Sequence, residues 1–188
     1  MSDTTAPIVA YLGGHGSFSE EACHRFVPAH HLMPVSDFAS VALAVCEGSA
    51  DVGVLPLSNS LAGPIAAVRR LLSHPELRIV GEEVLDVRLH LLAIPGASIR
   101  HIIRVVSHPA ALVQCERFLA EQAWGLTPTE STAEAARQVG AAADHTLAAI
   151  GSEAAAMIYG LDVLARDLQG DAENVTRFAI VERRDQFA

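Results

Sequence analysis

The chain has 188 residues, of which 51% are hydrophobic and 19% charged, and this composition excludes a disordered protein. The formal net charge of −9 argues against a nucleic-acid partner, and no apolar run reaches the roughly 18 residues of a membrane helix. All 13 basic residues are arginine, which excludes a Schiff-base lysine and a P-loop lysine.

Short apolar runs alternate with helical patterns along the first half of the chain. The capping box Ser17-x-x-Glu20 opens a helix, and Gly48 stands where a C-terminal cap is expected. Ser58-Asn59-Ser60 indicates a polar turn, and Pro64 suits a first helical turn. The predicted elements of this half are strands over 8–12 and 51–57, and helices over 17–26, over 38–45 and from Pro64.

The stretch from Arg78 to Ile94 is long and extended in pattern, and we expect it to carry the chain from one lobe into another. The alternation then resumes, with a second capping box at Ser131-x-x-Glu134 and a cap at Gly160. The predicted elements of this half are strands over 103–107, 126–130, 146–150, 163–167 and 176–181, and helices over 110–123, from Ser131 and over 152–159.

Strand–helix alternation with short connections predicts an α/β fold with one or two mostly parallel sheets. We expect two α/β lobes within a single catalytic domain, the second lobe inserted in the first. The first lobe comprises residues 1–86 and 168–188, and the second comprises residues 87–167.

Hydroxyl, amide and glycine residues follow several of the predicted strands, where helices begin. In open α/β sheets ligands collect at this edge, and free backbone N–H groups there favour a small anion. The alternative is that these residues are ordinary helix N-caps, which prefer the same residue types. The segments are Gly13-Gly14-His15-Gly16-Ser17, Ser58-Asn59-Ser60, Ser107-His108, Ser131-Thr132 and Gly151-Ser152.

Polar residues also gather at the start of the last predicted strand. Thr176 offers one proton that can be donated, and Arg177 can hold a carboxylate with two parallel hydrogen bonds. Alternatively, Thr176 is simply a strand former and Arg177 a surface residue. Asn174 completes this polar group.

Other sites find little support. Nine histidines are present, but none has the H-x-x-x-H or H-E-x-x-H spacing of a helical zinc site, so we expect no metal. Cys115 falls on an apolar helix face, so we expect its side chain to pack in the core. The three cysteines are far apart, and the N-terminal segment lacks a signal pattern, so we expect a cytoplasmic protein without disulfides.

Several motifs in order and spacing resemble the prephenate dehydratase family. The resemblance runs from Ala10 to Phe178. The matching stretches are Ala10–Gly13 with Gly16–Glu20, Ala50–Pro56 with Asn59, Ser60 and Gly63, Ser107–Pro109 with Gln114-Cys115, Ser131–Ala136, Tyr159–Leu161 and Asn174-x-Thr176-Arg177-Phe178.

The resemblance implies two α/β lobes around a cleft, similar to type 2 periplasmic binding proteins, usually as a homodimer without metal or organic cofactor. It implies conversion of prephenate, a small dicarboxylate, to phenylpyruvate, water and carbon dioxide. By that resemblance, Thr176 assists departure of the ring hydroxyl and Arg177 binds carboxylate. The residues it places in substrate binding are Ser17, Asn59, Ser60, Ser107, His108, Ser131, Thr132, Asn174 and Phe178.

The sequence departs from the family pattern at two polar positions: Ser58 replaces a glutamate and Ala110 a glutamine. The chain ends ten residues after Phe178, so we expect no C-terminal ACT regulatory domain. Two further readings stay open: a diverged enzyme acting on prephenate or a related ring acid with a different outcome, and an inert protein that binds a small carboxylate. The sequence does not separate prephenate from arogenate.

Overall fold

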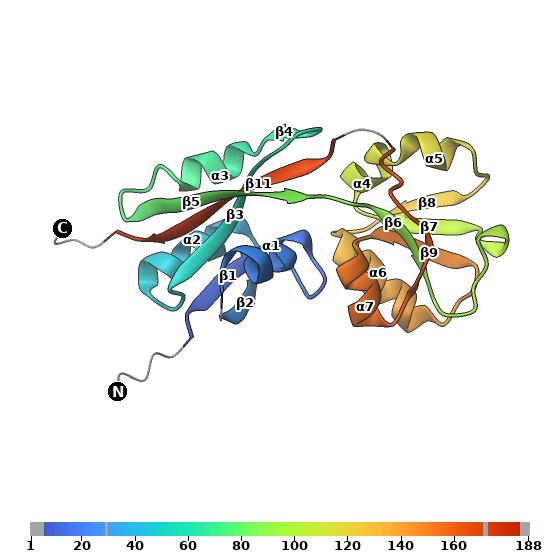
Figure 1. Ribbon diagram of the computed structural model, residues 1–188, viewed down its shortest axis with the longest axis horizontal. Helices are drawn as coiled ribbons and strands as arrows, with labels where there is room; N and C mark the ends of the chain where they lie inside the picture. Colours follow the sequence, from blue (N-terminus) through green and yellow to red (C-terminus); the bar gives the residue numbers. More distant parts are fainter. Residues whose placement is uncertain (1–5, 29, 171–172, 185–188) are drawn as a thin grey trace. The chain divides into compact units, whose positions relative to one another are not determined.

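The computed structural model describes residues 6–28, 30–170 and 173–184, which form two compact units (Figure 1). Unit 1 comprises Met1–Gly14, Ser19–Leu85 and Val175–Ala188, and unit 2 comprises His15–Phe18 and Asp86–Asn174. Each unit contains one β-sheet with helices packed against it. No helix in the described part of the chain is both long and apolar enough to cross a membrane.

Unit 1 is built on a sheet with the strand order β2-β1-β3-β11-β5, to which β4 adds beside β3. Its helix α2 begins at the cap Asp37, whose side chain accepts from the Ser40 N–H, and ends at Gly48 in the left-handed conformation. The strands are β1 (Ile8–Leu12), β2 (His31–Val35), β3 (Val52–Asn59), β4 (Gly63–Pro64), β5 (Leu77–Asp86) and β11 (Val175–Arg183). The helices are α1 (Phe18–Phe26), α2 (Phe38–Glu47) and α3 (Ala66–Leu71).

The core of unit 1 lies between its sheet and α2. Val41 and Val45 are fully buried, as the helical spacing predicted, and pack against β1, β3 and β11. Gly53 allows this contact, because a Cβ there would lie 2.9 Å from Val181 and 3.0 Å from Val41. This packing holds β3 and β11, the two strands that carry candidate site residues.

Unit 2 has the strand order β10-β6-β9-β7-β8. Ser131 and Ser152 cap its two main helices, and Gly160 ends α7 in the left-handed conformation. The strands are β6 (His90–Ala93), β7 (Arg104–Ser107), β8 (Gly125–Pro128), β9 (Leu147–Gly151) and β10 (Asp162–Ala165). The helices are η1 (Ile99–His101), α4 (Pro109–Gln114), α5 (Glu116–Ala120), α6 (Thr132–Ala142) and α7 (Glu153–Tyr159).

The α/β fold with two sheets is confirmed, but the expectation of mostly parallel sheets is wrong. β1 is parallel to β2 and β3, and β7 is parallel to β8 and β9. However, β11 is antiparallel to β3, and β6 is antiparallel to both β9 and β10. Both sheets are therefore mixed. β6 and β11 follow the two stretches that link the units, and an antiparallel pair needs no crossover helix.

Three local predictions also differ from the structure. Ser58 and Asn59 belong to β3 rather than to a turn, and Pro64 pairs with Ser58 in β4 instead of opening α3. Ile65 is the N-cap of α3. The helix predicted over 110–123 is two helices, because Cys115 leaves the helical conformation with φ −101° and ψ 12°.

The chain passes from unit 1 to unit 2 after Leu85 and returns at Val175. The sequence placed this return at residue 168. In the structure Leu168 is buried in the core of unit 2, and its N–H donates to the Leu89 carbonyl over 2.8 Å. The contacts of Leu168 therefore keep the segment that follows β10 with unit 2.

Candidate active site

The candidate residues of unit 1 meet where β11 begins beside the end of β3. Thr176 lies opposite Asn59 in the antiparallel register. The Asn59 Nδ2 donates to Thr176 Oγ1 over 3.1 Å and to the Val175 carbonyl over 3.2 Å. Its Oδ1 accepts from the N–H groups of Leu61 and Ala62, both at 3.0 Å, which defines the orientation of the amide.

This arrangement determines the role that the Thr176 hydroxyl can play. Because its oxygen accepts from Asn59, its own proton is directed elsewhere and can be donated. The residue is only 9% exposed, so water competes little for that proton. The amide N–H also stabilises negative charge on the oxygen, which makes the hydroxyl a better proton donor.

Ser60 positions the first residues of β11. Its N–H donates to the Val175 carbonyl over 2.9 Å, and its Oγ accepts from the Val175 N–H over 3.0 Å. With the Asn59 contact, these bonds hold the backbone immediately before Thr176 on both sides. In the structure Ser60 therefore acts on the position of Thr176 through the main chain.

Arg177 lies on the opposite face of β11 from Thr176, because successive residues of a strand point to opposite faces. Its register partner is Ser58, and its Nη1 lies 3.3 Å from Oε2 of Glu82 on β5. The Arg177 side chain is 57% exposed. The structure thus does not bring the Thr176 hydroxyl and the Arg177 guanidinium together within unit 1.

Phe178 belongs to the core of unit 1. It is 1% exposed, and its ring centroid lies 6.5 Å from that of Phe26 on α1. It shares a face of β11 with Thr176, two residues away. Its packing therefore anchors the strand beneath the candidate hydroxyl.

The candidate residues of unit 2 follow the parallel strands β7, β8 and β9, whose carboxyl ends share one edge of the sheet. Ser107 ends β7, and its hydroxyl donates to the Ile150 carbonyl over 2.7 Å. His108 begins α4, and its Nδ1 accepts from the Ala110 N–H over 3.2 Å. Ser131 and Thr132 open α6 after β8.

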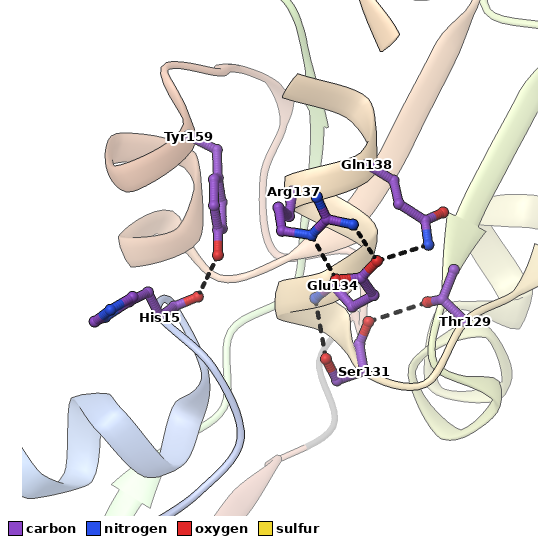
Figure 2. A network of polar contacts seen from close by, with 7 residues as sticks. All are labelled: His15, Thr129, Ser131, Glu134, Arg137, Gln138 and Tyr159. Carbon is purple, nitrogen blue, oxygen red and sulfur yellow. Dashed lines mark hydrogen bonds and ion pairs between the residues drawn. The ribbon is translucent and has the colours of Figure 1, made fainter. Parts of the chain in front are cut away.

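Figure 2 shows the start of α6. The Ser131 hydroxyl oxygen accepts from the Glu134 N–H over 3.0 Å, so Ser131 is an N-cap, as the alternative interpretation held. Arg137 donates two 2.7 Å bonds to the Glu134 carboxylate, and Gln138 donates a third of 2.9 Å. These bonds, led by those from Arg137, hold the pKa of Glu134 at about 2.

The loop before α1 belongs to unit 2. The Ser152 hydroxyl donates to the Gly16 carbonyl over 2.9 Å. The Tyr159 hydroxyl donates to the His15 carbonyl over the same distance (Figure 2). Gly16 has φ +82°, and a Cβ there would lie 2.8 Å from Ala155 Cα. Only glycine fits at this close approach to α7, immediately before Ser17.

The predicted anion-binding segments therefore do not share one sheet edge. The segments around Gly16, Ser107, Ser131 and Ser152 belong to unit 2, whereas Ser58–Ser60 belongs to unit 1. β3 and β7 belong to different sheets, one in each of the two expected lobes, so Ser58–Ser60 stands apart from the other segments.

Asn174 lies in unit 2, immediately before β11. It is 5% exposed, its Nδ2 donates to Gln114 Oε1 over 3.0 Å, and its carbonyl accepts from the Val87 N–H over 2.7 Å. Gln114 and Glu82 are two residues to which the sequence assigned no role. Gln114 stood in a quoted motif, whereas nothing in the local pattern marked Glu82 as the partner of Arg177.

Two of the cysteines are unsuited to nucleophilic chemistry. Cys23 and Cys115 are fully buried, and burial raises the pKa of each thiol to about 12. Both thiols are therefore protonated at neutral pH. The prediction that Cys115 packs in the core is confirmed.

The comparisons with known proteins agree with one another. A family model described as prephenate dehydratase matches residues 9–186. The Arabidopsis thaliana arogenate dehydratase/prephenate dehydratase 2 is 42% identical over 175 residues, which are 93% of this chain and 46% of that protein. The chain thus spans about half the length of this relative.

Two solved structures share the fold. A prephenate dehydratase from Arthrobacter aurescens, in complex with L-Phe, superimposes with a TM-score of 0.87 at 29% identity, covering 95% of this chain and 61% of that one. A protein described as a novel type of quorum quenching acylase superimposes with a TM-score of 0.86 at 34% identity, covering 95% of this chain and 64% of that one.

Proposed function

Because this chain belongs to the prephenate dehydratase family, we propose that it removes water and carbon dioxide from prephenate, or from the related ring acid arogenate. The product is phenylpyruvate from prephenate and phenylalanine from arogenate, so the reaction belongs to phenylalanine biosynthesis. The observation that carries this proposal is the Asn59–Thr176 contact, which turns the Thr176 proton toward an acceptor other than Asn59.

In the proposed reaction, the bond between the ring and its carboxylate breaks, and its electron pair stays with the ring. The electron pair moves through the ring diene and expels the hydroxyl at the opposite carbon, which leaves an aromatic ring. The Thr176 hydroxyl donates its proton to the departing oxygen, which leaves as water, and solvent replaces the proton. The Asn59 N–H stabilises the negative charge that builds on Oγ1 meanwhile.

We propose that Arg177 binds a substrate carboxylate by exchanging partners. In the structure it contacts Glu82, and both side chains are substantially exposed, at 57% and 44%. Such exposed pairs contribute only about 0–1 kcal/mol, so a carboxylate ligand can displace Glu82 at small cost. Ser58, which faces Arg177 in the register, adds no negative charge to oppose this exchange.

The remaining predicted residues divide into two roles in the proposal. Ser60, Asn174 and Phe178 position β11 through hydrogen bonds and packing. A substrate-binding role for Ser17, Ser107, His108, Ser131 and Thr132 of unit 2 stays a prediction from the resemblance. The homodimer, the cytoplasmic location and cofactor-free chemistry stay predictions from the sequence.

The test is to incubate the purified protein separately with prephenate and arogenate near neutral pH and to identify products by chromatography. We expect aromatic product faster than in enzyme-free controls, and a loss of at least about 100-fold in kcat for Thr176→Val, the lower end for general-acid assistance. Thr176→Ser is the matched control, because it keeps the hydroxyl and should retain most activity.

The other outcomes identify the alternatives. A non-aromatic product would indicate a diverged enzyme, and binding without turnover would indicate a carboxylate-binding protein. Aromatic product at an unchanged rate in Thr176→Val would refute the role of Thr176 while leaving the reaction in place.

A further inference from the structure

Three potential metal ligands of different chemistry gather in unit 1, outside the residues assigned to catalysis. Cys46 Sγ lies 3.9 Å from His74 Nδ1. One ligand atom from each of Cys46, His74 and Glu76 lies within 4.8 Å of the other two. No sequence motif marks this cluster, because Cys46 is 28 residues from His74.

The backbone around the cluster is held on both sides. Cys46 lies in the last turn of α2, and its carbonyl accepts from Arg183 Nη1 over 3.4 Å. His74 and Glu76 lie in the loop between α3 and β5. The His74 N–H donates to the Leu71 carbonyl over 3.0 Å, and the Glu76 carbonyl accepts from the Arg184 N–H over 2.6 Å.

The imidazole presents a nitrogen lone pair to this cluster. His74 Nδ1 accepts from the Glu76 N–H over 3.4 Å, and the same nitrogen lies 3.9 Å from the Cys46 Sγ. An unprotonated imidazole nitrogen is the form that ligates a metal. The long 3.4 Å bond is readily given up in exchange for a metal ion.

The three ligand types together select a class of ion. Thiolate, imidazole and carboxylate all ligate Zn²⁺ at about 2.0–2.3 Å, whereas Mg²⁺ and Ca²⁺ prefer oxygen ligands alone. A thiolate and a carboxylate supply two negative charges, which neutralise a divalent ion. Three protein ligands leave one tetrahedral position for water.

A surface cavity of about 660 Å³ gives access to the cluster. All three ligands line it, together with Leu43 and Glu47 on α2. This volume leaves room for the ion and for its water ligand between ligand atoms that lie within 4.8 Å of one another.

We propose that Cys46, His74 and Glu76 form a binding site for a divalent transition-metal ion of the Zn²⁺ type. The bound ion links the end of α2 to the loop before β5. This site is separate from the proposed dehydratase chemistry, so it does not depend on that function.

The test uses Co²⁺ as a spectroscopic probe of the full chain, with Zn²⁺ as competitor. We expect one equivalent of Co²⁺ to give the visible bands of a tetrahedral site and a near-ultraviolet thiolate-to-metal band, both abolished by Zn²⁺. Cys46→Ser should remove the thiolate band, and His74→Ala and Glu76→Gln should each weaken binding at least tenfold.

Glu47→Gln is the matched control, because it removes a neighbouring negative charge in the same cavity without removing a proposed ligand. Its Kd for Co²⁺ should lie within about threefold of the Kd of the unmodified chain. On a logarithmic scale this is roughly half of a tenfold change. Circular dichroism checks that each variant is folded. Absence of a thiolate band in the folded unmodified protein, or the same band in Cys46→Ser, would overturn the proposal.

Discussion

Gly16 offers a quantitative test of how the loop before α1 is held. In Gly16→Ala, the left-handed backbone at φ +82° costs roughly 1–2 kcal/mol for any residue with a Cβ. The added Cβ would also lie 2.8 Å from Ala155 Cα and 2.9 Å from Ala155 Cβ, which forces the loop away from α7. That movement strains the 2.9 Å bond from the Ser152 hydroxyl, worth about 1 kcal/mol.

Because reduced freedom of the unfolded chain returns about 0.4–1 kcal/mol, the net loss in the free energy of unfolding is about 2 kcal/mol. Two other glycines separate the contributions. Gly63 has φ +80° with nothing near its Cβ position, so Gly63→Ala should cost about 1 kcal/mol. Gly14 has neither constraint, and Gly14→Ala should change stability by less than about 0.5 kcal/mol.

Equilibrium urea unfolding, followed by circular dichroism, measures the three variants under identical conditions. Because the Gly16 contact lies in unit 2, hydrogen exchange at β7 and β9 provides a local measurement of the stability of that unit in Gly16→Ala. If Gly16→Ala costs no more than Gly63→Ala, the close contact with Ala155 does not determine the conformation of the loop, and the reasoning fails.

Three further predictions concern the charged and amide contacts. Arg177→Ala should raise KM about 10–100-fold if the guanidinium binds a carboxylate, since charged hydrogen bonds contribute about 1.5–3 kcal/mol. Glu82→Gln should lower KM, because it removes the competing carboxylate. Steady-state kinetics with no change in KM in either variant would show that Arg177 is structural. Gln114→Ala should reduce stability by about 1 kcal/mol through loss of the bond to Asn174, as measured by urea unfolding, and a neutral effect would show that Asn174 is held by other contacts. The pKa of Glu134 lies at about 2, below its ordinary 4.5, so its ionised form stabilises the folded state above pH 4.5 and that contribution disappears as the pH falls toward 2. The stability difference between the unmodified chain and Glu134→Gln should therefore shrink over this range in urea titrations at several pH values, and a constant difference would contradict the assignment.

Local features of the fold follow from the sequence where the signal is short-range. Gly48, Ser131 and Gly160 were readable as helix boundaries because each acts on backbone groups within a few residues. Strand direction was not readable in this way. The antiparallel place of β11 beside β3 depends on a chain that leaves unit 1 and returns, and strand patterns are the same in either direction.

The candidate site shows the same division. The Asn174-x-Thr176-Arg177 pattern predicts a site at the start of β11, but period-two alternation and the Glu82 contact separate Arg177 from Thr176. The Asn59–Thr176 bond joins residues 117 positions apart, so only the fold shows how the amide orients the hydroxyl. The Cys46–His74–Glu76 cluster has no helical ligand spacing, so only the fold brings these three side chains together.

The position of β11 has a consequence for synthesis on the ribosome. β11 lies between β3 and β5 in the sheet of unit 1, yet Asp86–Asn174 of unit 2 are translated before it (Figure 1). At about 5–20 residues per second, this interval lasts roughly 5–20 s. Throughout it, β3 presents an unpaired edge that can join a strand of another nascent chain. Unit 2 can therefore fold first, and the strand that carries Thr176 closes the sheet of unit 1 as one of the last steps of folding.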